Sequence, residues 1–555
     1  MSVNLRPTVL ATLFLGVLSA CSGGVQELTD RGAVIDAGLS DRGAWPDAEP
    51  EDAGASSDAG ASSDVGTLDA GLALDAEAQA DAGLPPLDLK ARLQAIAGLD
   101  VEEITPVLEG TRAFILKLEQ PEDHQNPGGT HFKQRLVLLH RSESAPLVLH
   151  TTGYDLFGSE EQWAEIQMEP TTLLEANQLT VEHRFFGESI ATSADWTKLT
   201  IEQSAGDSHR IVEILSQIYR SPWVATGVSK GGMTALFHRR FYPDDVAVTM
   251  PYVAPISFDD GFGGPDPRYL DWVAQIGPAD GACRERVLDM KVEVCQRRAE
   301  LASFLLATDP RVLVIRPEVL EVAVTLSAFG FQWSFWQYYG SVEACAQLPV
   351  RGGPIADLAA WFPLEPSSLI EPAHYDPGLW PYLYQVSNEL ASQAIDDSNL
   401  ATVTATIDYS LLPNLPYDPA PWGEDPPYDP QAMRAVDAFL RTGAHHVLGI
   451  YGAWDPWTGG RPTLDLANDN ALYSVDGHGH DAQLSFLPED QQAQALTLLQ
   501  TWIGRSLRDP RGPRRPNAMV DDQATVVRLL RERELITSRN QGARSRPLPR
   551  NRRAG

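Results

Sequence analysis

The sequence is short of positive charge, of cysteine and of long apolar runs. Its 43 Lys and Arg face 75 Asp and Glu, which gives a formal net charge of −32 at pH 7. An acidic excess of this size argues against nucleic acid as a partner of the whole molecule. No internal apolar run is long enough to span a bilayer. Neither a Cys-x-x-Cys pair nor a His/Cys grouping occurs, so the sequence predicts no metal site and no cofactor.

The start of the chain has the pattern of an export signal. In residues 1–21, Arg6 supplies a positive charge and Val9–Leu18 a short apolar run. The order Leu18-Ser-Ala-Cys21 also resembles the lipobox of bacterial lipoproteins, in which the cysteine carries the lipid. We therefore expect an exported chain that is tethered to the cell envelope by acyl chains at Cys21. An ordinary secretory signal that contains a cysteine is the alternative.

Three further cysteines lie in the middle of the chain. Cys283, Cys295 and Cys345 would be exported and would meet an oxidising environment, so we expect one disulfide and one free thiol. The sequence does not decide which two of them are paired.

Two segments of biased composition flank the middle of the chain. Residues 22–85 are acidic and have too few large apolar side chains to form a core, so we expect a disordered linker. Residues 511–555 are rich in arginine and are expected to be mostly disordered. A solvated tail is the simplest interpretation, and contact with an anionic partner is the alternative. The linker repeats the triplet Asp-Ala-Gly, which starts at Asp36, Asp52, Asp58, Asp69 and Asp81.

Between these segments, runs of strand length alternate with helical runs. This alternation predicts an α/β domain with a largely parallel sheet. The pattern changes to long helical stretches over residues 258–440, so we expect a core of residues 86–257 and 441–510 that is interrupted by a helical cap. The expected strands are residues 114–118, 132–140, 146–151, 178–183, 223–225, 246–253, 447–451 and 472–475. The expected long helices are residues 201–219, 284–306, 317–327 and 488–507.

One strand-to-helix turn has the pattern Gly-x-Ser-x-Gly. The run 223–225 leads into Gly227-Val-Ser229-Lys230-Gly231, and a helical run follows. In this setting the pattern is typical of a nucleophile elbow, because small residues on both sides of the serine let the strand and the helix approach each other. We therefore expect Ser229 to be a nucleophile, with an ordinary tight turn as the alternative. The N–H of Lys230 would then point to where an oxyanion forms.

A serine nucleophile needs a base and an acid that orients the base, in the chain order Ser, Asp, His for this kind of fold. Asp455 follows a predicted strand. Of the 12 histidines, only His478 and His480 lie beyond it, in a loop that follows the next strand. The carboxyl ends of parallel strands meet at one sheet edge, where we expect Ser229, Asp455 and a histidine to converge. An earlier strand ends at Gly153 and Tyr154, the candidates for a second oxyanion donor.

Several longer motifs resemble the secreted bacterial prolyl tripeptidyl aminopeptidases and, more distantly, the lysosomal Pro-Xaa carboxypeptidases. They run in the expected order from about residue 112 to 505, which makes the resemblance specific. The resemblance implies an α/β-hydrolase with a helical cap that cleaves short peptides, often after proline. The motifs are Gln120-Pro-Glu-Asp-His124, Phe132-Lys-Gln-Arg135, Glu182-His-Arg-Phe-Phe-Gly-Glu-Ser189, Ser229-Lys-Gly-Gly232, Phe335-Trp-Gln-Tyr338 and Tyr384-Gln385.

The same resemblance implies roles for individual residues. Ser229 is the nucleophile, Asp455 the acid, and the base lies in a Gly-x-Asn-His-like loop. The sequence Gly477-His-Gly-His480 fits if His480 is the base and a glycine replaces the usual asparagine. Asp481 stands where a glycine is expected, and this departure keeps His478 open as the alternative base. Glu389 matches a carboxylate that binds the substrate amine in related exopeptidases, with an exposed helix carboxylate as the alternative.

These observations favour a lipid-anchored serine exopeptidase that acts on short peptides outside the cytoplasm and touches a membrane only through its anchor. An esterase or lipase on the same fold is the first alternative, because a fold does not fix the substrate. A catalytically inactive surface lipoprotein that binds a partner is the second.

Overall fold

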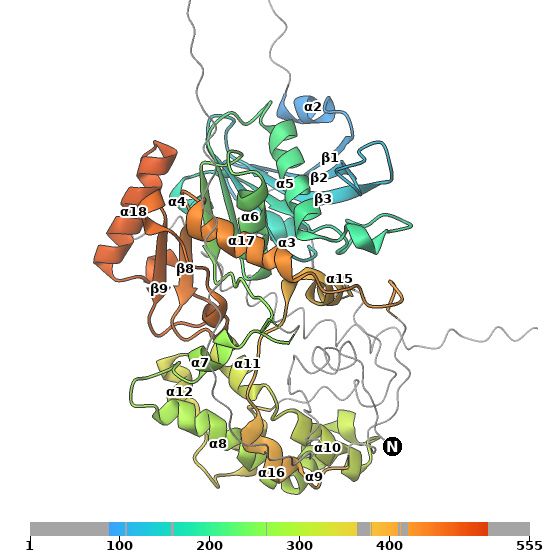
Figure 1. The fold of residues 1–555 in the computed structure, drawn as a ribbon, viewed down its shortest axis with the longest axis vertical. Coiled ribbons are helices and arrows are strands. Elements are labelled where there is room, and N and C mark those ends of the chain that lie inside the picture. Colours follow the sequence, from blue (N-terminus) through green and yellow to red (C-terminus); the bar gives the residue numbers. More distant parts are fainter. Residues whose placement is uncertain are drawn as a thin grey trace, which may run out of the picture. The chain divides into compact units, whose positions relative to one another are not determined.

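The computed structural model describes residues 88–105, 108–156, 160–261, 264–362, 378, 380–408, 411 and 420–508 (Figure 1). The expected export signal with Cys21, the acidic linker and the Arg-rich tail lie outside these residues. Within the described ranges, no helix is both long enough and apolar enough to cross a bilayer.

The core is a nine-stranded sheet in the order β1-β2-β3-β5-β4-β6-β7-β8-β9. The strands from β1 through β3 to β5 pair antiparallel, and those from β5 to β9 pair parallel. The predicted α/β core with a largely parallel sheet is therefore confirmed. The strands are β1 (Leu99–Ile104), β2 (Arg112–Pro121), β3 (His131–His140), β4 (Leu147–Thr151), β5 (Asn177–Val181), β6 (Trp223–Val228), β7 (Val248–Tyr252), β8 (Leu448–Gly452) and β9 (Ala471–Val475).

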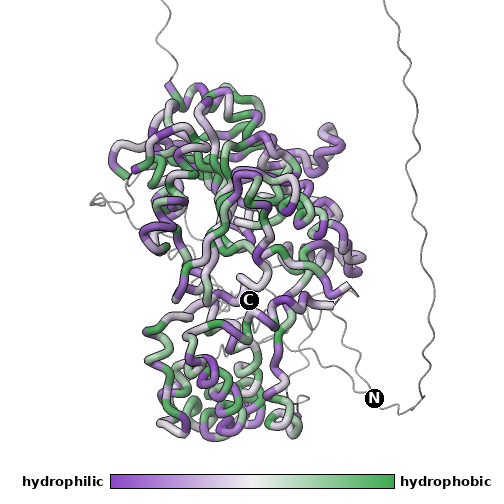
Figure 2. The backbone as a smooth tube through the Cα atoms, turned by 60° about the vertical axis from the view of Figure 1, so that its left-hand side comes forward, coloured by the Kyte–Doolittle hydropathy of each residue, from purple (hydrophilic) through white to green (hydrophobic). Residues whose placement is uncertain are grey.

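The parallel strands are apolar because both of their faces are covered. All residues of β4, β5, β6, β7 and β8 are buried, and the hydropathy colouring shows hydrophobic residues along the strands (Figure 2). Strand β1 was not among the expected strands. Its sequence Leu-Asp-Val-Glu-Glu-Ile is half acidic, and it forms the edge of the sheet, where water covers part of it.

Helices cover both faces of this sheet. On one face, α3, α4 and α18 share a hydrophobic cluster with Ile115 and Val137. On the other face, α2 and α5 pack on Phe114 and Leu116, the alternate residues of β2, and α17 packs on α6. The helices of these two layers are α2 (Leu89–Gln94), α3 (Glu160–Glu165), α4 (Glu169–Leu173), α5 (Ile201–Leu215), α6 (Lys230–Phe241), α17 (Pro430–Thr442) and α18 (Glu489–Ile503).

The segment between β7 and α17 is helical, and most of its helices surround a hydrophobic cluster of their own. The expected helix 284–306 is two helices, α8 and α9, because Arg297 leaves helical geometry with φ −100° and ψ 17°. The helices of this segment are α7 (Arg268–Val273), α8 (Ala282–Gln296), α9 (Arg298–Thr308), α10 (Pro317–Leu326), α11 (Phe331–Tyr338), α12 (Val342–Gln347), α13 (Ile355–Ala359), α15 (Trp380–Gln385) and α16 (Ala401–Thr404), and the π-helical turn η4 (Val386–Leu390) follows α15.

One disulfide joins two of these helices. Cys283 at the start of α8 is bonded to Cys345 in α12, and Cys295 is a buried free thiol. The predicted count of one disulfide and one thiol is confirmed, and the structure supplies the pairing that the sequence left open.

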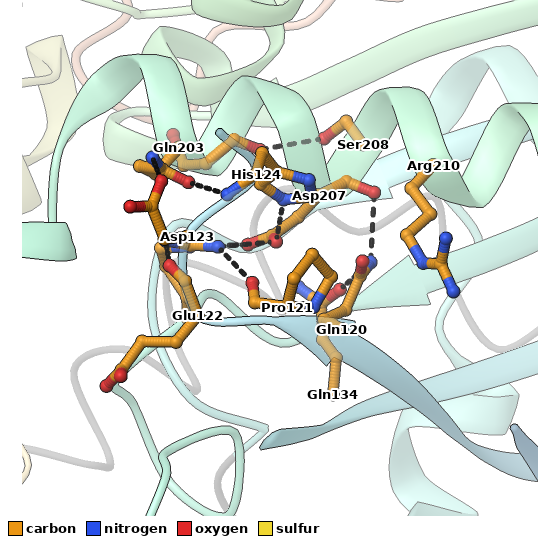
Figure 3. Close-up of polar contacts among 12 residues, drawn as sticks. Gln120, Pro121, Glu122, Asp123, His124, Gln134, Gln203, Asp207, Ser208 and Arg210 are labelled. Atoms are coloured by element: carbon orange, nitrogen blue, oxygen red, sulfur yellow. Dashed lines mark hydrogen bonds and ion pairs between the residues drawn. The ribbon is translucent and has the colours of Figure 1, made fainter. Parts of the chain in front are cut away.

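The Gln120–His124 motif forms part of a buried polar network between the end of β2 and helix α5 (Figure 3). The Asp207 carboxylate accepts a hydrogen bond from His124 Nε2 (2.8 Å) and two from the Arg184 guanidinium (both 2.7 Å). Gln120 donates to the carbonyl oxygen of Asp207 (3.1 Å) and Gln203 accepts from the His124 N–H (2.8 Å). These contacts fix the loop after β2 and the loop after β5 on α5.

Burial and pairing act on Asp207 in opposite directions. Burial raises the pKa of its carboxyl group, but the charge and hydrogen bonds of Arg184 and the hydrogen bond from His124 outweigh it, so the net pKa lies below its usual value. A carboxyl whose pKa is lowered by folding stabilises the fold above its unfolded pKa, and this contribution disappears as the pH falls through the folded pKa.

We predict that Asp207→Asn lowers the free energy of unfolding by about 3–5 kcal/mol at neutral pH, because it leaves the fully buried Arg184 without a counter-charge. Urea unfolding followed by circular dichroism measures the change.

The matched control is Glu188→Gln, which removes a half-exposed carboxylate that pairs with Lys117 and, at 3.6 Å, with Arg135. It should cost less than about 1 kcal/mol, because Arg135 keeps its ion pair with Glu182. Equal losses in the two variants would contradict the prediction.

Candidate active site

Ser229 lies between β6 and α6 in a strained backbone conformation, with φ 55° and ψ −125°. Positive φ is rare for a residue with a side chain and costs on the order of 1–3 kcal/mol. Two backbone contacts fix the turn: the Ser229 N–H donates to the Tyr252 carbonyl (2.9 Å), and the Ser229 carbonyl accepts from the Met233 N–H (2.9 Å). The serine is thus held at the carboxyl end of a central strand.

The motif requires glycines because the surrounding backbone leaves no room for a side chain. A Cβ atom on Gly227 would overlap the backbone of Gly231, and one on Gly231 would overlap the Thr151 carbonyl oxygen at the end of β4. The sequence reasoning expected this close approach, and the packing supplies its physical cause.

The structure brings His480 and Asp455 together. His480 Nδ1 lies 2.7 Å from Asp455 Oδ2, and both side chains are almost fully buried. Asp455 follows β8 and caps the next turn, since its other carboxylate oxygen accepts the Trp457 N–H (3.1 Å). His480 lies in the loop after β9. Because β6, β8 and β9 run parallel in one sheet, Ser229, Asp455 and His480 all follow carboxyl ends at the same sheet edge.

His478 has a different environment. Its Nδ1 lies 3.3 Å from Asp481 Oδ2, and its ring stacks on Phe486. Its side chain is about one-third exposed. Asp481, the residue that stood where a glycine was expected, is therefore the partner of His478. The geometry favours His480 over His478 as the base.

The helical segment touches both the acid and the base. The indole N–H of Trp272 in α7 donates to the Asp455 carbonyl oxygen (2.8 Å). The N–H of His480 donates to the Gln337 carbonyl oxygen in α11 (3.3 Å). Trp454, the residue before the acid, is buried in the cluster of the helical segment and meets the Trp336 ring edge-on at 5.9 Å. The run of aromatic residues in α11 is thus core of the helical segment as well as support for the His480 loop.

Steric crowding explains why position 479 holds a glycine in place of the expected asparagine. A Cβ atom on Gly479 would lie 2.6 Å from the Trp336 carbonyl oxygen. Any side chain at this position would push α11 away from the loop of His480. The departure from the family pattern is therefore compensated by closer contact between the loop and the helical segment.

The loop after β4 lies directly against the elbow. A Cβ atom on Gly153, which has φ 76°, would lie 2.5 Å from the Gly231 nitrogen. The N–H of Tyr154 donates to Thr152 Oγ1 (3.2 Å), whereas the N–H groups of Gly153 and Lys230 have no hydrogen-bond acceptor among the described residues. Of the two candidates for the second oxyanion donor, the geometry favours Gly153.

Three features of this region escaped the sequence reasoning. The Lys230 side chain is buried and donates from Nζ to the Gly153 carbonyl oxygen (2.6 Å). The buried carboxylate of Glu169 accepts the N–H groups of Leu484 and Ser485 (both 2.8 Å), and so fixes the loop after His480. The Trp272 indole supports the acid. These contacts join segments far apart in the sequence, and no local pattern marks them.

Glu389 lies in η4 and is 8% exposed, so the alternative of an exposed helix carboxylate is excluded. One carboxylate oxygen accepts the N–H of Ile201 at the start of α5 (2.8 Å). Burial raises the pKa of Glu389 to about 7, and the single backbone hydrogen bond offsets this only in part. No cationic side chain among the described residues forms an ion pair with this carboxylate, so it is suited to bind a cation.

Metal ligands do not gather at this site: among the described residues, no group of three or more His, Cys, Asp or Glu side chains could hold a metal ion. The chemistry that the site can perform with its own residues is nucleophilic attack by a serine assisted by a histidine.

Comparison with known proteins identifies relatives. The sequence model of the PS-10 peptidase S37 family matches residues 82–534. A prolyl tri/tetrapeptidyl aminopeptidase of Streptomyces mobaraensis is 32% identical over 439 residues, which are 77% of this chain and 87% of that protein.

Solved structures that match the chain include a proline iminopeptidase of Mycobacterium smegmatis, which is 14% identical with a TM-score of 0.30 and is matched over 73% of this chain and 99% of that chain. A peroxisomal alpha-beta-hydrolase of Saccharomyces cerevisiae is 11% identical with a TM-score of 0.28, over 78% of this chain and 98% of that chain. With its mostly parallel sheet and its strand–Ser229–helix turn, the chain has an α/β-hydrolase core, as the sequence predicted.

We predict that His480→Ala lowers kcat for an acyl substrate by about 10⁴-fold or more, as removal of the base does in other serine hydrolases. His478→Ala is the matched control in the same loop, and should keep kcat within about threefold because its partner is Asp481. Steady-state kinetics of the two variants measures the difference. The reverse order of losses would make His478 the base.

Proposed function

Because the chain belongs to the PS-10 peptidase S37 family, it is a serine peptidase, and we propose that it releases short peptides from the free N-terminus of its substrates. The observation that carries the proposed mechanism is the buried 2.7 Å contact of His480 with Asp455 at the sheet edge that also bears the strained Ser229. The name of the Streptomyces relative supports the exopeptidase class.

In the proposed reaction, Ser229 Oγ attacks the carbonyl carbon of the scissile peptide bond while His480 Nε2 takes the hydroxyl proton. Asp455 holds the imidazole by its Nδ1 and stabilises the imidazolium that forms. The N–H groups of Lys230 and Gly153 donate to the oxyanion. His480 then gives its proton to the leaving amine, and an acyl-enzyme remains on Ser229. A water molecule hydrolyses this ester by the same steps.

We propose Glu389 as the group that binds the substrate's N-terminal ammonium. The carboxylate is buried, it accepts one backbone hydrogen bond from the described part of the chain, and burial raises its pKa to about 7. An ammonium group would supply the missing counter-charge, and a charge-assisted hydrogen bond is strong where water is excluded.

The spacing along α15 and η4 supports a short released peptide. The ring of Tyr382 lies 6.0 Å from the ring of Tyr154, beside the oxyanion loop, and Glu389 follows seven residues later. The stretch is α-helical to Gln385 and π-helical from Val386, so with a rise of about 1.5 Å or less per residue the two positions are at most roughly 10 Å apart along the helix. An extended peptide spans about 3.3–3.6 Å per residue, so this distance corresponds to about three residues.

We propose that the enzyme works outside the cytoplasm and is anchored through a lipid at Cys21. The signal-like pattern of residues 1–21 supports export. The disulfide between Cys283 and Cys345 supports an oxidising compartment, because such bonds are rare in the reducing cytosol.

The test uses the purified protein on fluorogenic tripeptide and tetrapeptide substrates with free or acetylated N-termini, beside simple acyl esters. We expect cleavage of the free-amine peptides and none in the Ser229→Ala variant. Cleavage of acyl esters without cleavage of any peptide would indicate an esterase instead. An unreactive Ser229 towards an organophosphonate, together with no turnover, would indicate a binding protein.

We predict that Glu389→Gln lowers kcat/KM for free-amine peptides by about 10²-fold, because the charge-assisted pair is lost, and leaves acyl ester hydrolysis unchanged. The ammonium needs the ionised carboxylate, so the ratio of peptide to ester kcat/KM should rise with pH through about 7 in the wild type. This rise should be absent in Glu389→Gln.

The matched control is Glu202→Gln, which removes an exposed carboxylate from the neighbouring start of α5. It should leave both activities unchanged. A loss in Glu389→Gln that is equal for peptides and esters would refute the proposed role.

A further inference from the structure

The Lys230 side chain is an unusual group to find behind a nucleophile. It is 3% exposed, and no carboxylate within the described part of the chain forms an ion pair with it. Its Nζ lies over the rings of Tyr154 (5.3 Å) and Phe186 (4.9 Å). Burial lowers the pKa of this amine well below its usual value. Burying a basic group without a counter-charge costs stability, so a purely packing role would be served better by an apolar side chain.

Among the described residues, this amine donates one hydrogen bond, and the acceptor lies in the oxyanion loop. Nζ donates to the Gly153 carbonyl oxygen at 2.6 Å. The backbone of Lys230 supplies one proposed oxyanion donor, and Gly153 supplies the other. The same residue therefore connects the two donors: its backbone begins α6, and its side chain ends on the loop that carries the second N–H.

The other contacts of this loop do not hold the Gly153 carbonyl in place. Gly153 has φ 76°, and a glycine can also adopt other backbone conformations at little steric cost. Thr152 Oγ1 holds the flanking backbone at the Val181 carbonyl (2.9 Å) and the Tyr154 carbonyl (2.6 Å), but the carbonyl of Gly153 itself is held by Lys230. A rotation of the Gly153 backbone would carry its N–H away from the oxyanion.

We propose that the Lys230 side chain is a positioning residue that fixes the Gly153 backbone, so that both oxyanion donors are oriented before the substrate binds. This inference rests on the proposed function. The amine acts through Gly153 and does not touch the reacting atoms. Donors that are oriented in advance act mainly on the transition state, where the negative charge develops, and contribute little to binding of the ground state.

The test is Lys230→Met, which keeps the length and the apolar stem and removes the donor. We expect kcat to fall by about 10–100-fold for both a free-amine peptide and an acyl ester, with KM changed by less than about threefold. Affinity for a peptide boronic acid, which mimics the tetrahedral intermediate, should fall by the same factor as kcat/KM. The Tm should be equal to that of the wild type or higher, whereas loss of a merely structural contact would lower it.

Thr234→Val is the matched control. Thr234 Oγ1 donates to the backbone carbonyl of Lys230 (3.0 Å), so this variant removes a buried hydrogen bond at the same residue and leaves the bond to Gly153 intact. Its kcat should stay within about threefold of the wild type. If Lys230→Met does not fold, Lys230→Gln replaces it: its amide keeps a donor one atom short of Gly153, and a smaller loss of kcat in the same pattern is expected.

The outcomes distinguish the role of the Lys230 side chain from the proposed function of the enzyme. An active wild type whose Lys230 variants keep kcat and boronate affinity would overturn the role of Lys230 alone. Loss of kcat accompanied by an equal loss in Thr234→Val would also overturn it, because general disturbance of α6 would then be the cause. A wild type that neither cleaves peptides nor hydrolyses acyl esters would overturn the proposed function together with this inference.

Discussion

The buried hydrogen bond between His480 and Asp455 is the contact on which the rest of the site depends. Both groups are taken out of water, so the pair is stable only while the surrounding chain keeps their geometry. The backbone on each side is fixed by contacts that come from elsewhere in the sequence: the Trp272 indole on Asp455, the Gln337 carbonyl on His480, and the Glu169 carboxylate on the loop that follows. The strands of the sheet place the two residues at one edge, and these contacts set the final orientation of the two side chains.

The helical segment is therefore part of the catalytic architecture and more than a cover. It provides the carbonyl that receives the His480 N–H and the apolar cluster that holds Trp454 next to the acid. The disulfide between Cys283 and Cys345 joins two of its helices. On the other side of the site, α15 and η4 bring Tyr382 to the oxyanion loop and Glu389 to the start of α5. In the proposed function, chemistry and substrate selection thus both depend on the same inserted segment.

The sequence was sufficient to predict the features that depend on local patterns. The elbow around Ser229, the chain order of acid and base, and the apolar parallel strands all follow from spacing and residue size. Long-range contacts could not be read in this way. The Gln120–His124 motif contributed to the family resemblance, but nothing in the sequence indicated that its histidine contacts the buried carboxylate of Asp207. The sequence did not predict the break at Arg297 or the edge strand β1. At these positions packing and exposure to water determine the structure more than local helix and strand propensity do.

Gly479 has a consequence for exchanging parts between related enzymes. Because the Trp336 carbonyl occupies the space of its missing side chain, the His480 loop and helix α11 are complementary surfaces that must change together. A chimaera could keep the loop of this chain and receive the helical segment of a relative that has a bulkier residue at the position of Gly479. A gap would then remain between the loop and the helix. The opposite chimaera would contain a clash. Recombination boundaries for this enzyme should therefore keep residues 331–338 and 477–481 from the same parent.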